Sequence, residues 1–428
     1  MNIIERGREF VQSLLRLAKR TCWDWRRCPY CGQDDTCKHG TYVRRPWFFD
    51  GRREIHVQRH RCYGCRRTYS EQSALLVRGG WYAREVRRKG IDLWQHAGNS
   101  FRRAAEGLRS EMGRQERWQI WRPLDPEPPE EKRCHLCAST VHRWVDGAGR
   151  RAQEGVQGQL EGVPTSGQMG TDGLWARLRQ GCRRVVLALM DSVTGVLWPP
   201  VVVESEEEAS WKRMFEQAKE GGLDLDALRG VTSDGVNGLI GCLIEMLAWV
   251  NHQRCVWHLW RNLSGKIAWR VSRAATGLVG EAARTAQEAA RKAMTGLIHK
   301  VLDASTFEQA EAALTELMSH PLDMGLGKMI LDLVEPALMY LLEYNRGLVR
   351  VAPEWCWRDF RLRLSRGRNH GSERRLARAA TLWAVYRNFT PAQWRSERKR
   401  TYRRPGKTPL EVAGVSLGRV SYLDALGI

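Results

Sequence analysis

The sequence predicts an α/β protein in which helices cover a mixed β-sheet, with a small cysteine-rich module in front of it. Three strand-like apolar runs follow one another between residues 168 and 203, and helix-like and strand-like runs then alternate to residue 258. This order is typical of a mixed sheet with helices on its faces. Helix-like patterns continue from about residue 259 to 348, so we expect a helical block after the sheet.

The periodicity of apolar residues gives each expected element its limits. The expected strands are Gln168–Trp175, Arg184–Met190, Val196–Val203, Leu228–Ser233 and Gln253–His258. The expected helices are Glu206–Lys219, Val236–Trp249, the Ala-rich Glu281–Lys300 and the amphipathic Phe307–Met318.

The chain divides into a basic N-terminal third and a larger part that contains the expected sheet. A Pro-rich stretch at 123–131 cannot continue a helix and is typical of a stiff linker. A Gly-rich polar stretch at 147–167 marks the main expected boundary. Residues 1–20 have apolar positions among charges without a cleavage pattern, which predicts a helix and not a signal peptide.

The charge of the chain points to a polyanionic partner. There are 69 Lys and Arg against 48 Asp and Glu among 428 residues, a formal net charge of +21. Guanidinium groups favour bidentate contacts with phosphate oxygens, and no apolar run reaches the roughly 18 residues that a membrane span needs. We therefore expect a nucleic acid as the partner, and no membrane.

Two pairs of cysteines predict a zinc site near the N-terminus. Cys28 and Cys31 form one C-x2-C pair, and Cys62 and Cys65 form another. Such pairs present thiolates at the spacing that a tetrahedral zinc site requires, and the strand-like residues between them predict a zinc ribbon. Disulfides are the alternative, but isolated cysteines elsewhere in apolar surroundings favour a reducing, cytoplasmic compartment.

The same module is rich in arginine among aromatic residues, which is typical of phosphate contacts. A solvated basic face is the alternative. The arginines expected to contact DNA here are Arg44, Arg45, Arg52, Arg53, Arg66 and Arg67.

A helix-turn-helix-like region is expected between the ribbon and the sheet. Helical spacing over Ile91–Arg109 is interrupted at Gly98 and Asn99, a plausible turn. Beyond the linker, a segment that begins at Cys137 predicts a recognition helix that exposes His142 and Arg143, and Arg143 is a further expected DNA contact. A hairpin of helices that only pack together is the alternative.

Two aspartates stand at the expected sheet, each followed by a glycine that lets another backbone approach closely. Asp172 lies within the first strand, and Asp234 closes the fourth. Acids on neighbouring strands can face one site, and carboxylates that converge on two metal ions are what phosphoryl transfer by two metals requires. Asp-Gly is also a common turn sequence, so the alternative for either aspartate taken alone is that it only forms a turn.

A third acid completes an order that resembles a known family. Glu373 opens an expected helix after Asn369, His370, Gly371 and Ser372, and Cys255 and His258 form a C-x2-H motif after Asp234. In this order the chain resembles DDE transposases with an RNase H-like core, specifically the Mutator-like group and related bacterial insertion-sequence enzymes. The resemblance covers roughly residues 167 to 378, and an N-terminal zinc ribbon is common in such enzymes.

This resemblance implies that Asp172, Asp234 and Glu373 bind magnesium or manganese and catalyse cleavage and strand transfer at the ends of a mobile DNA element. It also implies that Cys255 and His258 support the site, that the protein is prokaryotic and nucleoid-associated when on DNA, and that it acts as a homo-oligomer. Rival acids are Glu354, Asp359 and Glu397. The rival functions are a nuclease of the same fold without strand transfer, and a zinc-ribbon DNA-binding protein without catalysis.

The domains expected on this basis are a zinc-ribbon module with an N-terminal helix at 1–80, a helix-turn-helix-like region at 81–150, the first part of the core at 165–265, a helical insertion at 266–365, and the return of the core with a basic tail at 366–428.

Overall fold

The computed structural model describes residues 26–71, 75–77, 79–96, 98–113, 136–155, 160–179, 181–320, 337–342, 349, 357, 360–361, 363, 370–391 and 406–428. The expected N-terminal helix, the linker at 123–131, Glu354, Asp359, Asn369 and Glu397 lie outside these residues.

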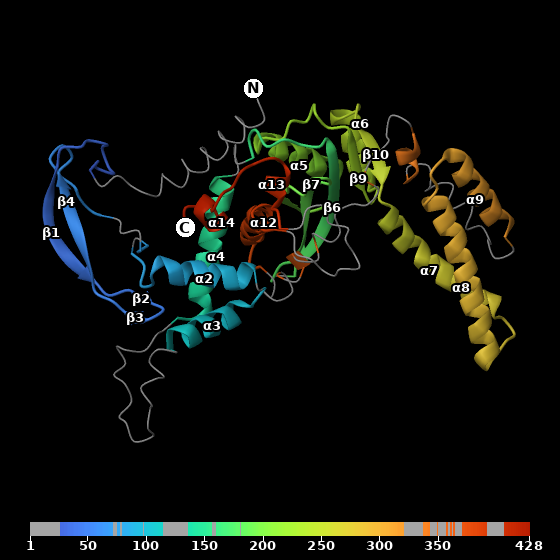
Figure 1. The fold of residues 1–428 in the computed structure, drawn as a ribbon, viewed down its shortest axis with the longest axis horizontal. Helices are drawn as coiled ribbons and strands as arrows, with labels where there is room; N and C mark the ends of the chain where they lie inside the picture. The colour runs from blue at the N-terminus through green and yellow to red at the C-terminus, as the bar shows by residue number, and fades with distance from the viewer. Residues whose placement is uncertain are drawn as a thin grey trace, which may run out of the picture.

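A five-stranded mixed sheet forms the centre of the molecule (Figure 1). Its strands in spatial order are β10 (Asn251–Arg254), β9 (Gly230–Ser233), β6 (Gln168–Arg177), β7 (Arg183–Asp191) and β8 (Val201–Val203). β10, β9 and β6 pair in parallel, whereas β7 is antiparallel to both of its neighbours. The mixed sheet expected from the sequence is therefore confirmed.

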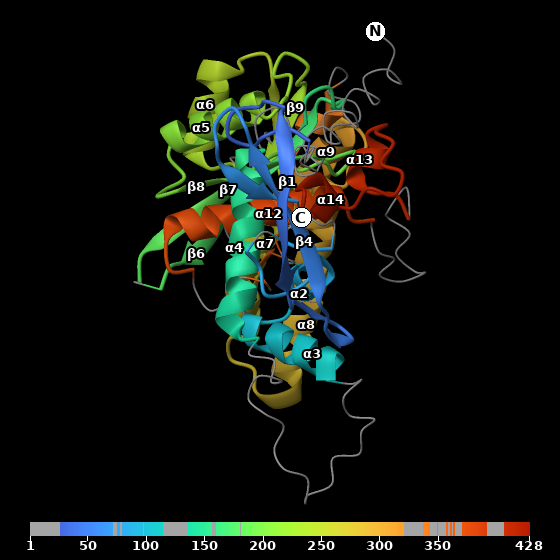
Figure 2. The same ribbon diagram turned by 90° about the vertical axis from the view of Figure 1, so that its left-hand side faces the viewer.

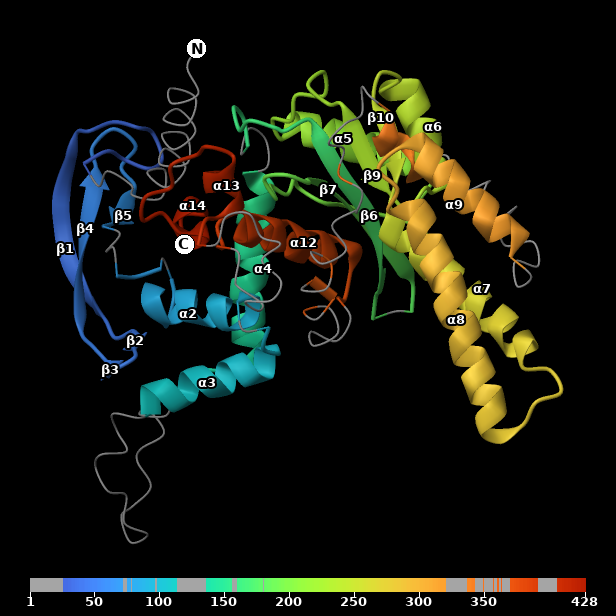
Figure 3. The same ribbon diagram turned by 45° about the vertical axis from the view of Figure 1, so that its right-hand side comes forward.

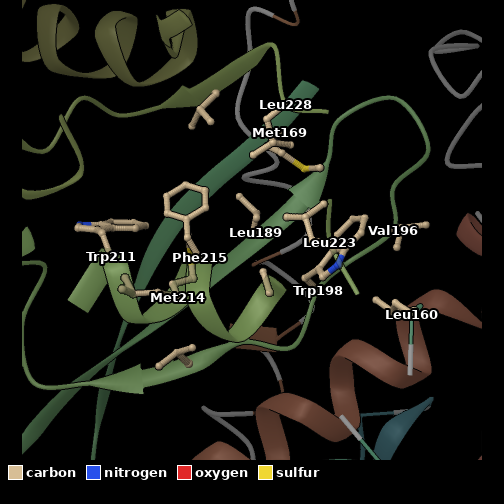
Figure 4. Packing of buried hydrophobic residues seen from close by; sticks show 14 of the residues in the cluster. Leu160, Met169, Leu189, Val196, Trp198, Trp211, Met214, Phe215, Leu223 and Leu228 are labelled. Carbon is tan, nitrogen blue, oxygen red and sulfur yellow. The ribbon is translucent and has the colours of Figure 1, made fainter. Parts of the chain in front are cut away.

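Alternate residues of β6 and β7 are buried on opposite faces of this sheet, because successive side chains of a strand point to opposite sides. On one face, Leu187 and Leu189 pack with Trp211 and Phe215 of α5 (Glu208–Glu220), and α6 (Asn237–Met246) extends this layer (Figure 4). On the other face, Leu174 and neighbouring even-numbered residues pack with α12 (Glu373–Asn388). Burial on both faces explains why these strands have continuous apolar runs.

The last helix turn of α12 is fixed to the edge of the sheet by one side chain. Asn388 is buried, its amide nitrogen donates to the carbonyl of Leu197 at 2.9 Å, and its oxygen accepts from the amide of Leu197 at 2.8 Å. This pair of bonds fixes the position of α12, and therefore of Glu373 at its start, relative to β7 and β8.

Three helices project from the β10 edge of the sheet as a separate arm, α7 (Val256–Ala274), α8 (Gly280–Leu302) and α9 (Phe307–Ser319) (Figure 3). The expected helices Glu281–Lys300 and Phe307–Met318 match α8 and α9. Buried Gln253 connects the arm to the sheet: its side chain donates to the carbonyl of Ala337 at 2.7 Å and accepts from the amide of Tyr340 in η3 (Met339–Leu341).

The cysteine-rich module is a small antiparallel sheet that stands apart from the central sheet. It comprises β1 (Thr36–Arg44), β4 (Ile55–Cys62) and β5 (Thr68–Ser70), with a short hairpin of β2 (Trp47–Phe48) and β3 (Gly51–Arg52). Trp47 and Phe48 join the core of the adjacent helices, so the hairpin is the apolar attachment of the module.

Between the two sheets lie α2 (Arg84–Gln95), α3 (Phe101–Gly113) and α4 (Ala138–Glu154). They share one core with α12 and with α14 (Tyr422–Ala425), which follows α13 (Pro409–Val412). Seen from the ribbon side, α4, α12 and α14 lie behind β1 and β4 (Figure 2). Helices from both ends of the chain therefore form this middle unit.

Two expected strands are shorter than the sequence indicated. The run Val196–Val203 pairs regularly only at β8, because Pro199 and Pro200 have no N–H group to donate to a neighbouring strand. The prediction of a strand at Gln253–His258 is wrong beyond Arg254, because β10 ends there and α7 begins at Val256. Among the described residues, no helix is both long and apolar enough to cross a membrane.

Candidate metal centre and candidate active site

Four cysteines of the ribbon converge into one cluster. The sulfur atoms of Cys28, Cys31, Cys62 and Cys65 all lie within 4.8 Å of one another, with 3.5 Å between Cys28 and Cys65 and between Cys31 and Cys62. Zinc–sulfur bonds of about 2.3 Å in a tetrahedron place sulfurs roughly 3.8 Å apart. The cluster therefore fits a zinc ion, and the expected zinc-binding residues are brought together.

The Cys28 thiol is poised to lose its proton. Burial opposes its charged form, but hydrogen bonds from the backbone of Tyr30 and Cys31 and from the neighbouring thiols outweigh burial and lower its pKa to about 7. A thiolate is the form that ligates a metal.

The two cysteine pairs use the same backbone geometry with different residues. The residue after the second cysteine is left-handed in both pairs, with φ of 75° at Gly32 and 58° at Arg66. Arg66 is the one non-glycine residue with positive φ among the residues that the structure describes. A left-handed conformation is unfavourable for a residue with a Cβ, so Arg66 carries local strain that Gly32 avoids.

The ribbon arginines are in part held by the protein itself. Arg44 donates to the carbonyls of Val77 and Gly80, which fastens the ribbon to the segment before α2. Arg45 pairs with Glu54 at 2.7 Å, and Arg53 pairs with Asp50. Arg52 lies over the ring of Trp47, and Arg67 lies over the ring of Tyr30.

The expected recognition helix is α4, and it is enclosed rather than free. Its residue Trp144 contacts Tyr82 edge to face, and its residue His142 packs edge to face against Phe101 of α3. His142 is therefore half-buried and not exposed as expected, whereas Arg143 is exposed. The other side of α4 packs on α12, where Asp146 pairs with Arg378 at 2.7 Å.

Asp172 lies within β6, and Asp234 directly follows the neighbouring strand β9. β6 and β9 pair from Gln168 opposite Gly230 to Gly170 opposite Thr232, and the same register continued by two residues sets Asp172 opposite Asp234. Residues opposite each other in a parallel pair point to the same face. The ladder ends before the two acids, so the strands separate where the carboxylates lie.

The environments of the two aspartates differ. Asp172 is 6% exposed, and its Oδ1 accepts from the amide of Gly173 at 2.8 Å. Asp234 is half-buried and comes just before Gly235, whose φ is 84°. The guanidinium of Arg254 lies 3.3 Å from where a Cβ on Gly235 would be, so a cation adjoins this acid.

A half-buried histidine lies next to the end of β9. His252 contacts the hydroxyl of Ser233 at 2.8 Å, and Ser233 in turn accepts from the amide of Gly235. Burial first, and then the charge of Arg254, lower the pKa of His252 to about 4. This histidine is neutral near pH 7.

Glu373 is on the same face but is engaged elsewhere. It is the first residue of α12, after the N-cap Ser372, and its Oε2 accepts from Nε of Arg184 at 2.8 Å. Arg184 lies opposite Ala176 in β6, four residues from Asp172, or roughly 13 Å along the strand. Among the described residues, the cysteines alone form a group of three or more close metal ligands, so Glu373 is not gathered with the aspartates.

Glu206, which was not among the expected site residues, lies beside Gly173 and near Asp234. Its carboxylate occupies the space where a Cβ on Gly173 would be, and Oε2 accepts from the indole of Trp175 at 3.1 Å. Burial raises its pKa, and the charge of Asp234 raises it further. The glycine after Asp172 is the sequence signal, because it leaves room for this acid.

Asp191, Cys255 and His258 lie in environments that a structural role explains. Asp191 is fully buried and accepts from Ser166, Val193 and Thr194, so it organises the turn after β7. Cys255 is fully buried just before α7, and its amide donates to the carbonyl of Ser233. His258 is half-buried in the first turn of α7.

Comparison with known proteins identifies part of this region. Residues 190–323 match the family described as Transposase, Mutator family. The match runs from the end of β7 to just beyond α9 and includes Asp234, Cys255 and His258, although it covers less than half of the chain. The resemblance to Mutator family transposases is thereby confirmed over this segment. No curated protein was found to match the chain.

Proposed function

We propose that this chain, which carries a Mutator family transposase segment, is a transposase that cuts DNA at element ends and joins the freed 3′ ends to a target. The observation that carries the proposal is that Asp172 in β6 and Asp234 directly after β9 come from paired neighbouring strands whose register, continued by two residues, sets them level, with Asp234 inside the matched segment. We also propose that the sheet is an RNase H-like core. The support is its strand order, in which only β7 runs against the other four strands.

Asp172 and Asp234 would hold divalent cations, with magnesium or manganese as the ions suited to carboxylate oxygens. Such ions activate a water or hydroxyl group and stabilise the leaving oxygen of an in-line displacement. A buried carboxylate such as Asp172 is costly unless a cation compensates it, which supports a metal-binding role. Arg254, beside Gly235, would contact a phosphate oxygen of the bound strand.

Glu373 remains the proposed third ligand because α12 packs on the face that carries the aspartates. In that role the carboxylate of Glu373 would leave its ion pair with Arg184 and bind a metal ion. Glu206 is the second candidate for this role, because it already lies beside Gly173 and near Asp234. Cys255 and His258 would support the site by fixing the start of α7 below β9.

The ribbon would hold zinc and would contact element-end DNA through the arginines expected from the sequence, Arg44, Arg45, Arg52, Arg53, Arg66 and Arg67, together with Arg143 of α4. Pairing of two ends by a homo-oligomer, the domain limits given above, and action on the nucleoid in a prokaryotic cytoplasm are parts of the same proposal.

The test is cleavage and joining on DNA with the ends that flank this reading frame, in magnesium, with wild type and Asp234→Asn compared. Wild type should cut and join, and Asp234→Asn should bind but cut at least a thousandfold more slowly, as expected from the loss of several kcal/mol of metal-assisted stabilisation. Asp226→Asn removes an exposed carboxylate before β9 and should behave as wild type. Cutting without joining would instead indicate a nuclease.

A DNA-binding protein without catalysis is the second candidate function, and the pairing of Glu373 with Arg184 favours it. In that case wild type and Asp234→Asn would bind equally and neither would cut.

A further inference from the structure

A cavity separates the zinc ribbon from the middle helices. Its volume is about 640 Å³, and it is bounded by β1, β4 and β5 on one side and by α2, α4 and the residues after α14 on the other. This size falls within the range of ligand-binding pockets. It lies on the ribbon side of α4, away from the face that carries Asp172 and Asp234.

The wall of the cavity is strongly basic. The arginines that line it are Arg44, Arg84, Arg87, Arg150 and Arg151. Glu71 is the one acidic side chain among the described lining residues, and it contacts the buried ring of His60 at 3.3 Å. The cavity therefore carries an excess of positive charge, which favours an anion.

Arg84 and Arg87 are half-buried beside this charge, with little compensation. In the part of the chain that the structure describes, the Nε atoms of both are buried and make no hydrogen bond. Burial, and then the charges of Arg151 and Arg84, lower the pKa of Arg87 to about 10. Like charges kept together in this way cost stability unless a ligand compensates them.

The other arginines have partners that explain their positions. Arg44 donates to the carbonyls of Val77 and Gly80, Arg151 donates to those of Leu426 and Gly427, and Arg150 lies 3.8 Å from Glu154. Arg84 and Arg87 are thus the two lining arginines whose charge the described protein leaves for a ligand.

The ribbon side of the cavity is aromatic. Tyr30, Tyr42 and Tyr69 line it, and the first two are 45% and 39% exposed. Arginines opposite exposed aromatic rings are typical of single-stranded nucleic acid sites, where bases stack on rings and phosphates meet cations. A cavity of this volume can admit one unpaired strand, which needs only its bases and phosphates to enter.

We propose that this cavity binds an unpaired DNA strand, with its phosphates at Arg84 and Arg87 and its bases against Tyr30 and Tyr42. The inference rests on the proposed function in that it takes DNA as the ligand. It assigns a second site to the chain, separate from the carboxylates, for a strand that has left the duplex near an element end.

The experiment measures the affinity of the full-length, zinc-loaded chain for a labelled oligothymidine by fluorescence anisotropy. A duplex of the same length, inorganic phosphate and a nucleoside triphosphate are tested as competitors. Arg87→Gln should weaken oligothymidine binding about tenfold and reduce the salt dependence by about 0.7 in log K against log salt, as for one phosphate contact on a single strand. Tyr42→Ala, on the opposite wall, should also weaken binding roughly tenfold by loss of stacking.

Arg213→Gln, which removes an exposed arginine from α5, is the matched control and should leave oligothymidine binding unchanged. Arg87→Gln should also raise the Tm of the free protein, because it relieves repulsion from Arg84 and Arg151. A lower Tm with unchanged binding would overturn the proposal and make Arg87 structural. Full displacement of the oligothymidine by inorganic phosphate or the triphosphate would also overturn it, in favour of a small phosphate ligand.

The failures of the two proposals are distinguishable. If Arg87→Gln and Tyr42→Ala weaken oligothymidine binding as expected but wild type does not cut DNA, the cavity proposal stands and the transposase proposal fails. If wild type cuts and joins while Arg87→Gln and Tyr42→Ala bind oligothymidine as wild type does, the transposase proposal stands and the cavity proposal fails.

Discussion

The two candidate metal-binding regions of the molecule are built from different lengths of chain. The cysteine cluster comes from two short turns within residues 28–65, and its sulfurs already lie within 4.8 Å of one another. The carboxylates come from β6, the end of β9 and the start of α12, spread over residues 172–373, and the third is paired with Arg184.

The difference shows which features of a site local spacing can determine. A C-x2-C turn fixes the separation of its own two thiols, so only the register of β1 and β4 has to bring the pairs together. An acid on a distant helix is positioned by packing and also competes for cations of the protein, as Glu373 does. The zinc site is therefore preassembled, whereas the carboxylate site would be completed by a change of partner.

The largest expected effect is at the preassembled site. Cys62 is fully buried, so Cys62→Ser should reduce bound zinc from one ion per chain to almost none and unfold the ribbon, because zinc binding and folding are coupled in such modules. Elemental analysis and hydrogen exchange of β4 measure this. Cys182→Ser changes an exposed cysteine outside the cluster and should retain zinc. Full zinc content in Cys62→Ser would contradict the assignment.

The next effect concerns the third acid. If Glu373 joins the metals, Glu373→Gln should slow cleavage about a thousandfold, comparable with Asp234→Asn, because a metal ligand is lost. Glu206→Gln should then slow it by no more than about tenfold. Rates of single-turnover cleavage distinguish the two. The reverse order would assign the third position to Glu206 and leave Glu373 as the structural partner of Arg184.

A smaller effect is expected from pH at the end of β9. The pKa of His252 is about 4 in the folded protein and 6.5 ordinarily, so between these values the unfolded chain binds the proton and the folded chain does not. The free energy of unfolding should therefore fall as the pH falls from about 6.5 to about 4. The slope of this change corresponds to the uptake of at most one proton by His252 on unfolding.

His252→Gln should reduce that slope in denaturant titrations with zinc content monitored in parallel, whereas His299→Gln, at an exposed position of α8, should not. His370 has a similarly lowered pKa, caused first by burial, so part of the slope should persist. An unchanged slope in His252→Gln would argue against a neutral half-buried histidine at this position.

The smallest expected effect concerns the left-handed residue that follows each cysteine pair, which is Gly32 in one pair and Arg66 in the other. Arg66→Gly places at Cys62–Cys65 the residue type that Gly32 provides at Cys28–Cys31. It should raise the free energy of unfolding of the zinc-loaded ribbon by about 1 kcal/mol, since left-handed strain is removed, and weaken DNA binding slightly through the lost charge. Thermal unfolding at saturating zinc measures the first change. A decrease in Tm would show that the Arg66 side chain stabilises the ribbon more than its conformation costs.

The sequence predicts the features that depend on local patterns. The apolar runs of β6 and β7, the helices α8 and α9, and both cysteine pairs were located to within a few residues. The turn at Gly98 is confirmed by its positive φ of 61°. The expected strand Val196–Val203 was too long, because its apolar pattern ignores that Pro199 and Pro200 have no N–H group for strand pairing.

What the sequence could not predict depends on contacts between distant segments. Nothing near Glu373 indicates that Arg184 would hold it, and nothing in α4 indicates that Gly149 would lie against the backbone of Arg378. The enclosure of α4, the proximity of Glu206 to Asp234 and the basic cavity all arise from such packing. The DNA-contacting arginines remain a prediction that binding data have to test.

The last residues of the chain close the core of its first helices, and this has a consequence for synthesis. Arg88 of α2 pairs with Asp424 at 2.7 Å, Tyr422 bonds to Asp92, and Leu423 and Leu426 fill the core that α2, α3 and α4 share. While a ribosome is still making the middle of the protein, these helices lack a large part of their apolar contacts. Prematurely terminated products should therefore have an incomplete middle unit, and the ribbon would not be held in the position that it has when residues 422–426 are present.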